Sequence, residues 1–248
     1  MIDMEKIKSG IKELDKILGG GIPKENITVI SGGVGTGKST LGMQFLEEGI
    51  KNNDETGLYI SFEEKKIPTL KHMQELGLNI KKLEEEKKLI FIEFPVSELE
   101  QLFEQEDAIK TMIETTDVKR VVIDPITPFG LLQKNELEKR QNLLHFIAKV
   151  RTWGTTTLLI GEDGRFKEND IPKTVSGIEN FTDGFIHLSN KLENRKRRRG
   201  LEIVKMRGCC FEEKIYDFII TKKGIEIIEN DTVKTKKTQK IHKKEGYL

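Results

Sequence analysis

The sequence predicts an α/β fold, in which helices flank a mostly parallel central sheet and antiparallel strands are added near the C-terminus. Three observations lead to this prediction. A short apolar strand at 27–30 runs directly into a glycine-rich loop and then into a helix. Further apolar strands and amphipathic helices alternate after it, which is typical of βαβ units. After Gly184 this alternation stops, and strand-like segments follow one another with no helix between them.

The hydrophobic pattern gives the expected elements. Parallel strands that are covered on both faces are short, continuous apolar runs. We place such strands at 27–30, 57–62, 89–94, 120–124 and 155–160. Helices are expected at 14–18, from Lys38 onward, and at 67–76, 99–113 and 136–150. The later strands are expected at 185–188, 201–206, 214–220 and 225–228, with a basic hairpin turn at 195–200.

The chain is expected to form one domain followed by a short tail. Its 248 residues fit a single α/β domain with a sizeable core, and we assign residues 1–230 to that domain. Residues 231–248 contain six lysines against one aspartate and one glutamate. This composition predicts a basic, flexible C-terminal tail.

Composition limits the classes of function. Charged residues make up 33% of the chain and hydrophobic residues 36%, as in globular proteins with a charged surface. We find no apolar run of membrane-spanning length and no signal-like N-terminus, so we expect no membrane contact and a cytoplasmic location. The four histidines have no metal-ligand spacing, and the adjacent Cys209 and Cys210 are expected to be strand residues.

Positive charge is concentrated in two places. The net charge is only +1, but residues 195–199 are all basic and the tail is rich in lysine. A nearly neutral chain is not typical of a dedicated nucleic-acid binder. The two basic patches nevertheless keep nucleic-acid binding open as an alternative.

A glycine-rich motif predicts the main ligand site. The pattern G-x-x-x-x-G-K-[ST] is met in full between an expected strand and an expected helix. Glycines let such a loop curl so that backbone N–H groups point at phosphate oxygens, and the helix N-terminus adds its positive dipole end. Lys38 would reach the β- and γ-phosphates, and the Ser39 hydroxyl would coordinate Mg²⁺. The predicted ligands are ATP and Mg²⁺, bound by Gly32, Gly33, Val34, Gly35, Thr36, Gly37, Lys38, Ser39 and Thr40.

Carboxylates at the ends of two expected strands would complete this site. The apolar run at 121–123 ends in Asp124, as expected of the aspartate that holds Mg²⁺ through water. The strand at 57–62 is followed by Glu63 and Glu64, and the carboxyl end of a parallel strand faces the ligand. These glutamates either orient the attacking water or are solvated loop acids.

Several segments together resemble the KaiC-like branch of the RecA superfamily. They are the lead-in from Ser9 to Pro23, the run Phe62-Glu63-Glu64, the segment Phe181-Thr182-Asp183-Gly184 and the element Lys205-Met206-Arg207-Gly208. The resemblance extends from about residue 7 to residue 228. It implies a RecA-like P-loop fold and a homo-oligomeric ring, expected to be a hexamer, with ATP bound between subunits.

The resemblance also implies roles for individual residues. Glu63 would activate the water and Glu64 would assist. Lys205 and Arg207 would reach the γ-phosphate of the neighbouring subunit, where an arginine stabilises the charge of the transition state. Glu162, at the end of the fifth expected strand, is either a sensor of the γ-phosphate or a solvated loop acid.

The chain departs from the family pattern in three places. The clock protein carries two such domains in tandem, and one is expected here. Residues 209–211 (Cys-Cys-Phe) replace the Ser or Thr and then His that often follow the K-x-R-G element, so contacts to the sugar or base are expected to differ. Glu179 and Asn180 occupy the place of a phosphorylated Ser-Thr pair, so we expect no clock-type autophosphorylation there. Thr174, Ser176 and Thr182 keep a weaker version of that activity open.

The predicted function is a ring-forming ATPase that acts as a regulatory or signalling switch, with its ATP state controlling an unidentified protein partner. One alternative is a RecA- or RadA-like DNA-binding ATPase, supported by the basic patches. Another is an autokinase or protein kinase that uses the same ATP site. A scaffold without hydrolysis is disfavoured because Glu63, Asp124 and Arg207 are all present.

Overall fold

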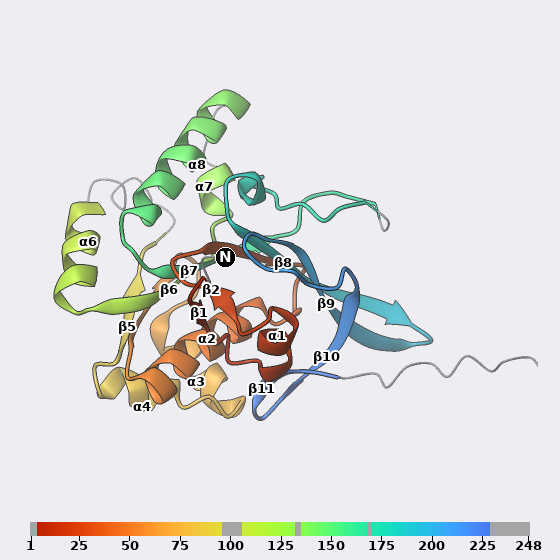
Figure 1. Cartoon of the computed structure of the whole chain (residues 1–248), viewed down its shortest axis with the longest axis horizontal. Coiled ribbons are helices and arrows are strands. Elements are labelled where there is room, and N and C mark those ends of the chain that lie inside the picture. Colours follow the sequence, from red (N-terminus) through yellow and green to blue (C-terminus); the bar gives the residue numbers. More distant parts are fainter. Residues whose placement is uncertain (1–3, 96–105, 132–134, 168–169, 229–248) are drawn as a thin grey trace, which may run out of the picture.

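The computed structural model describes residues 4–95, 106–131, 135–167 and 170–228. Within these residues a nine-stranded sheet has the order β11-β10-β9-β8-β3-β7-β6-β4-β5. Helices lie on both faces of this sheet (Figure 1). Neighbouring strands are parallel from β5 to β8 and antiparallel from β8 to β11. The predicted α/β class, with antiparallel strands added near the C-terminus, is confirmed.

The parallel part of the sheet contains all five strands that were expected before Gly184. Helices cover both faces of the sheet, so most side chains of these strands are buried. This agrees with their continuous apolar sequences. These five strands are β3 (Ile27–Gly32), β4 (Thr56–Ser61), β5 (Leu89–Glu93), β6 (Val118–Asp124) and β7 (Thr156–Glu162). A sixth strand, β8 (Gly184–Glu193), is parallel to β3.

The antiparallel edge differs from the prediction in its first hairpin. The basic segment was expected to be the turn, but β9 (Lys196–Met206) already includes most of it, and β8 and β9 pair as far as Glu193 and Lys196. The turn consists of Asn194 and Arg195, both with positive φ. Such a two-residue turn matches the twist of the paired strands. The hairpin is therefore longer than predicted, and β10 (Ile215–Thr221) and β11 (Gly224–Ile227) follow it.

Two hydrophobic cores hold the helices to the sheet. One core packs α1 (Lys12–Ile17), α2 (Lys38–Asn53), α3 (Lys66–Glu75) and α4 (Ile80–Glu85) against one face. The other packs α6 (Glu106–Thr115), α7 (Pro128–Leu131) and α8 (Glu136–Arg151) against the opposite face. Figure 1 shows α2, α3 and α4 on one side of the sheet and α6 and α8 on the other. Within the described ranges, no helix is long and apolar enough to cross a membrane.

Several short elements were not predicted from the sequence. They are β1 (Lys6–Ile7) and β2 (Ile22–Pro23), which pair with each other, together with α4, α7 and the 3₁₀ helix η2 (Ile178–Asn180). The second part of the helix predicted at 99–113 is α6, whereas residues 99–105 lie outside the described residues. The predicted tail at 231–248 also lies outside them.

Gly42 allows α2 to approach the centre of the sheet closely. A Cβ atom at this position would lie 2.9 Å from Val122 Cγ1 of β6, which is closer than carbon atoms normally pack. Glycine is unfavourable inside a helix, so its presence here indicates a packing requirement. The contact brings the N-terminal half of α2 next to β6, the strand that ends in Asp124.

Candidate active site

The predicted phosphate cradle lies between β3 and α2. Gly35 and Gly37 have φ angles of 72° and 98°, in the left-handed region that glycine adopts without strain. Gly32 is the last residue of β3, and a Cβ atom there would lie 2.5 Å from the carbonyl oxygen of Leu188. Lys38 Nζ donates to the carbonyl oxygens of Gly32 and Gly33 at 2.8 and 3.0 Å. The lysine ammonium thus lies over the cradle, where a phosphate would meet it.

Asp124 lies beside the first turn of α2, at the end of β6. Its carboxylate accepts a hydrogen bond from the Tyr59 hydroxyl and also contacts the Ser39 hydroxyl. Burial raises the pKa of Asp124, and the hydrogen bonds from Ser39 and Tyr59 oppose this rise. The structure therefore brings together Ser39 and Asp124, the two residues that were predicted to hold Mg²⁺.

Sequence reasoning missed Tyr59. Burial raises the pKa of its hydroxyl well above the usual value, and the negative charge of Asp124 raises it further. The phenol therefore stays protonated and can donate a hydrogen bond to Asp124. A polar side chain in an apolar strand is a signal in the sequence. That signal does not name Asp124 as the partner, because β4 and β6 are neighbours in the sheet but not along the chain.

The two glutamates after β4 have different surroundings. The Glu64 carboxylate accepts a hydrogen bond from the Thr69 hydroxyl at 2.9 Å, which ties it to α3. The Glu63 side chain is exposed at the mouth of the site. The carboxylate is nevertheless partly buried against the cavity. This partial burial raises the pKa of Glu63, and the charges of Glu162, Asp124 and Glu64 raise it further. A raised pKa makes the Glu63 carboxylate a better proton acceptor than a glutamate with an ordinary pKa.

A cavity of about 350 Å³ joins the cradle to these acids. Glu162, at the end of β7, lies on its wall. The cavity is lined by Val34, Gly35, Thr36, Gly37, Lys38, Ser39, Thr40, Glu63, Glu64, Asp124, Pro125 and Glu162. It therefore combines phosphate-binding backbone, a lysine and several carboxylates, which is the arrangement that a nucleotide with a divalent cation requires.

Lys205 and Arg207 lie away from this cavity, at the opposite end of the sheet. Met206 pairs with Gly184 at the start of β8, whereas the cradle follows the end of β3, and β3 runs parallel to β8. Six strand residues span roughly 20 Å. Neither side chain lines the cavity of its own chain.

Asp183 organises this second group of charges. Arg151 binds both oxygens of the Asp183 carboxylate at 2.9 and 3.0 Å, and Arg207 Nη1 lies 3.4 Å from Oδ1. Lys205 Nζ donates to the carbonyl oxygen of Glu179 at 3.0 Å. Partial burial lowers the pKa of Lys205, and the charge of Arg207 lowers it further. Arg151 and Arg207 therefore share one carboxylate, and Lys205 lies close enough for its charge to interact with those of Arg207 and Asp183.

The adjacent cysteines are not strand residues, contrary to the prediction. They follow β9 in a loop, because Gly208 has a φ of 80° and ends the strand. Cys209 is half-buried and Cys210 is exposed. Among the described residues, no group of histidine, cysteine, aspartate and glutamate side chains is arranged to hold a metal ion by itself.

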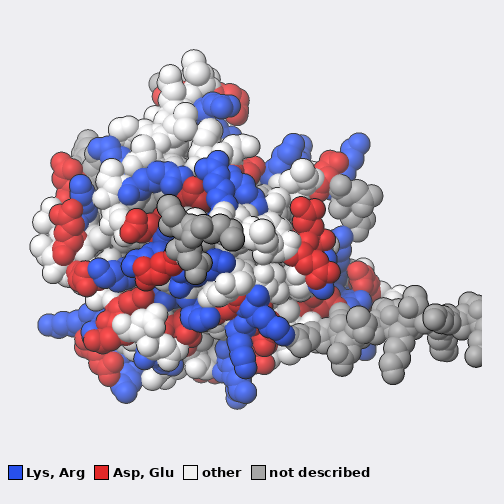
Figure 2. Space-filling view, in the orientation of Figure 1, with Lys and Arg blue, Asp and Glu red and all other residues white. Residues whose placement is uncertain are grey.

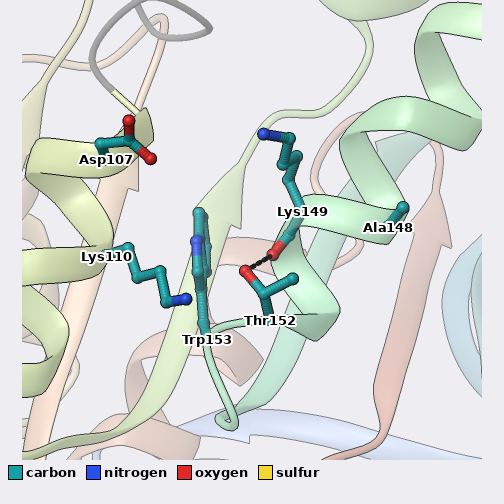
Figure 3. A pocket seen from close by; sticks show the side chains of 6 residues that line it. All are labelled: Asp107, Lys110, Ala148, Lys149, Thr152 and Trp153. Carbon is teal, nitrogen blue, oxygen red and sulfur yellow. Dashed lines mark hydrogen bonds between the residues drawn. The ribbon is translucent and has the colours of Figure 1, made fainter.

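A separate cavity of about 310 Å³ lies between α6 and the C-terminal end of α8 (Figure 3). The indole ring of Trp153 stands between Lys110 and Thr152 in this view. The cavity shares no lining residue with the cradle cavity. No residue of the glycine-rich loop lines it.

Comparisons with known proteins agree with this geometry. The family model described as "ATPase: KaiC" matches residues 7–232. The chain is 31% identical over 237 residues to the circadian clock oscillator protein KaiC of Parasynechococcus marenigrum, covering 91% of this chain and 45% of the relative. The chain thus spans about half the length of the curated KaiC relatives that it matches.

Relatives of similar length are found as well. A UPF0273 protein of Methanocaldococcus jannaschii is 30% identical, over 93% of this chain and 99% of that protein. The crystal structure of a KaiC-like protein from Pyrococcus horikoshii matches with a TM-score of 0.78 and 30% identity, covering 91% of this chain and 99% of that one. This chain therefore belongs to the KaiC family of ATPases, within the RecA superfamily.

Proposed function

We propose that this protein binds ATP with Mg²⁺ and hydrolyses it to ADP and phosphate in a homo-oligomeric ring, where each active site is shared between two subunits. The nucleotide state of the ring would then act as a regulatory switch for a protein partner. The observation that carries this proposal is the single cavity that contains the cradle, Asp124 and Glu63.

The cradle and its lysine bind the phosphates. Backbone N–H groups of residues 33–39 and the Lys38 ammonium bind the phosphate oxygens, and the Ser39 hydroxyl and Asp124 fit the requirements of Mg²⁺, Asp124 through a water. When bound, the ion neutralises charge on the β- and γ-phosphates. These contacts hold the γ-phosphate in one orientation at the edge of the sheet where Glu63 lies.

Glu63 is the general base in this proposal. It accepts a proton from a water molecule whose oxygen attacks the γ-phosphorus, the bond from that phosphorus to the bridging oxygen of ADP breaks, and inorganic phosphate is formed. The raised pKa of Glu63 favours this proton transfer at neutral pH. Glu64, held by Thr69, assists by keeping the loop in place.

The positions of Lys205 and Arg207 support a role in a neighbouring subunit. Both residues lie at the end of the sheet opposite the cradle of their own chain. A ring that places this end against the cradle of the next subunit would put two cations beside the γ-phosphate, where they stabilise the transition state. We propose a hexamer for this ring, as is expected for the family.

A mixing experiment tests the shared site. Lys38→Ala should remove nucleotide binding in its own subunit but keep Arg207 for the neighbour, whereas Arg207→Ala should do the reverse. Each variant alone should release almost no phosphate. A random mixture of the two in one ring should recover about a quarter of the wild-type rate, because that share of interfaces combines an intact cradle with an intact arginine.

Light scattering after size exclusion, with and without Mg-ATP, shows whether the ring forms. Lys119→Ala is the control, because this exposed lysine of β6 does not line the cradle cavity and pairs with the exposed Asp117. A mixture that stays inactive while the ring is intact, or an active Arg207→Ala variant, would contradict the shared site.

Autokinase activity is less well supported by the structure. Thr174, Ser176 and Thr182 are the hydroxyls nearest to the family's phosphorylated pair, and all three are at least 94% buried. Thr174 also donates to the Glu179 carboxylate. A phosphopeptide map after incubation with ATP should therefore show no phosphate on residues 174–182.

DNA binding is also not favoured. Figure 2 shows acidic and basic residues intermixed over the visible face, where a single basic field would be expected of a DNA groove. Within the basic hairpin, Arg198 is paired with Glu193 and Asp217. DNA affinity that falls steeply with salt and is lost on charge reversal of residues 197–199 would support this alternative.

A further inference from the structure

Tyr59 lies at the centre of the proposed metal site. Its side chain is 1% exposed in the middle of β4, and its hydroxyl donates to Asp124 Oδ2. The same hydroxyl contacts the hydroxyl of Ser39, which in turn contacts the Asp124 carboxylate. The three side chains form one polar cluster between the hydrophobic core, to which the Tyr59 ring belongs, and the cradle cavity, which Ser39 and Asp124 line. This cluster lies where α2 begins and β6 ends.

The sheet and its neighbours hold the phenol ring in place. In the parallel β4–β6 ladder, Tyr59 pairs with Val122 and Ser61 pairs with Asp124. Side chains two residues apart share one face of a strand, so Tyr59 and Asp124 lie on the same face of the sheet. Phe91 of β5 stacks on the Tyr59 ring, with centroids 5.0 Å apart and planes at 24°. The ring therefore has little freedom, and its hydroxyl is directed at Asp124.

The chemistry of the cluster requires fixed proton positions. A serine hydroxyl binds a cation through an oxygen lone pair, so its O–H group must donate a hydrogen bond to a different acceptor. Tyr59 and Asp124 are the acceptors that Ser39 contacts. The Tyr59 hydroxyl donates a hydrogen bond to one oxygen of Asp124 and so fixes the orientation of the carboxylate. The remaining lone pairs of the carboxylate are then available to water bound to the cation.

We propose that Tyr59 is a positioning residue of the metal site, whose hydroxyl holds Asp124 and Ser39 in the orientation that binds Mg²⁺. This inference rests on the proposed binding of ATP and Mg²⁺. It predicts a selective effect, because the phosphate contacts of the cradle do not involve Tyr59. The phenol matters for the part of nucleotide affinity that depends on Mg²⁺, and not for the rest.

The test is the variant Tyr59→Phe, which keeps the ring and removes the hydroxyl. Binding of a fluorescent ADP analogue to the full chain is measured with saturating Mg²⁺ and again with EDTA. We expect affinity in Mg²⁺ to fall about 10- to 100-fold, as is typical when a partner of a metal ligand is lost, and affinity in EDTA to stay unchanged. Binding of Mn²⁺ to the ADP complex, followed by electron paramagnetic resonance, should weaken by the same factor.

Tyr216→Phe is the matched control. The Tyr216 hydroxyl donates to the carbonyl oxygen of Glu212 at 3.3 Å, near the surface and outside the cluster, so both affinities should match the wild type. Wild-type Mg²⁺ dependence in Tyr59→Phe would overturn the inference. An equal loss of affinity in Mg²⁺ and in EDTA would also overturn it, because that result indicates a purely structural role. A wild-type chain whose ADP binding ignores Mg²⁺ would overturn the proposed function itself.

A second measurement needs no folded Tyr59→Phe variant. The chain has three tyrosines, so protein labelled with 3-fluorotyrosine gives three ¹⁹F resonances, and Tyr216→Phe and Tyr247→Phe assign them. Adding Mg²⁺ to the ADP complex should shift the Tyr59 resonance and leave the Tyr216 resonance in place. A Tyr59 resonance that does not move would overturn the inference.

Discussion

Arg207 and Asp183 form an ion pair at the end of the sheet that faces away from the cradle. Arg207 Nη1 lies 3.4 Å from Asp183 Oδ1, and the Arg207 backbone N–H donates to the Asp183 carbonyl oxygen at 2.9 Å. Arg151 binds the same carboxylate through both of its oxygens. The arginine that we assign to a neighbouring active site is therefore positioned by a buried carboxylate of its own chain.

Asp183→Asn should destabilise the protein in a way that depends on pH. Burial alone would raise the pKa of Asp183, but hydrogen bonds from Arg151 and the Ile27 amide, with the charges of Arg151 and Arg207, hold it below its usual value. The stabilising contribution is complete above the unfolded-state pKa of about 4 and is lost as the pH falls through the lower folded-state pKa. At pH 7 we expect a loss of about 2 kcal/mol, the scale of hydrogen bonds between charged groups.

Urea unfolding of the variant and the wild type at pH 7, 5 and 3 measures this effect. The difference in free energy of unfolding should narrow toward pH 3. Asp117→Asn is the control, because the Asp117 side chain is 79% exposed and should show almost no difference at any of these pH values. A gap for Asp183→Asn that is the same at all three pH values would show that the charge of the carboxylate is not involved.

Glu63→Gln should slow hydrolysis strongly and at the same time stabilise the nucleotide-free protein. Burial, with the charges of Glu162, Asp124 and Glu64, raises the pKa of Glu63. An acid with a raised folded-state pKa destabilises the folded state above that pKa, and this penalty disappears as the pH falls toward the unfolded value of about 4. Glutamine carries no charge, so the gain in stability should be present at pH 7 and absent near pH 4.

Thermal unfolding at pH 7 and pH 4 and a phosphate-release assay check both halves of this prediction. Loss of a general base should slow hydrolysis by about 10²- to 10⁴-fold, while a fluorescent ATP analogue still binds. In Glu64→Gln the amide oxygen can still accept the hydrogen bond from Thr69, so we expect a smaller loss of activity. Equal losses in the two variants would contradict the assignment of the base to Glu63.

The site was predictable where one physical rule was sufficient. Parallel strands present their carboxyl ends at one edge of the sheet, so Asp124 and Glu63 were expected beside the cradle, and the structure places them there. The Tyr59–Asp124 contact was not predictable, because the hydrophobic pattern of one sequence does not determine which strands are neighbours in the sheet. The basic hairpin was misjudged because its turn depends on positive φ angles at Asn194 and Arg195, and arginine is not a typical turn residue.

Gly42→Ala should weaken the contact between α2 and β6, although alanine favours helices. The added Cβ would lie 2.9 Å from Val122 Cγ1, and a packed valine cannot move far. Overpacking of this kind typically costs about 1–3 kcal/mol, whereas the gain in helix propensity is about 1 kcal/mol. We therefore expect the free energy of unfolding in urea to fall by roughly 1 kcal/mol.

The double variant Gly42→Ala/Val122→Ala tests the packing argument. It should lose less stability than the sum of the single variants, because the new methyl group fills the space that Val122 leaves. Additive losses would contradict the packing argument.

Arg120→Met tests the buried clamp that ties the N-terminal lead-in to the sheet. Arg120 is 1% exposed, forms an ion pair with Glu55, and donates to the carbonyl oxygens of Lys8 and Phe45. Removing the arginine leaves a mostly buried carboxylate and two carbonyl groups without their partner, which typically costs about 3–5 kcal/mol.

Adding Glu55→Leu to Arg120→Met should recover more than half of that lost stability, because the second substitution removes the unpaired charge. Urea unfolding measures both steps, and trypsin cleavage after Lys8 should become faster in Arg120→Met alone. If the double variant is as unstable as the single one, the unpaired carbonyl groups and not the charge of Glu55 dominate the loss.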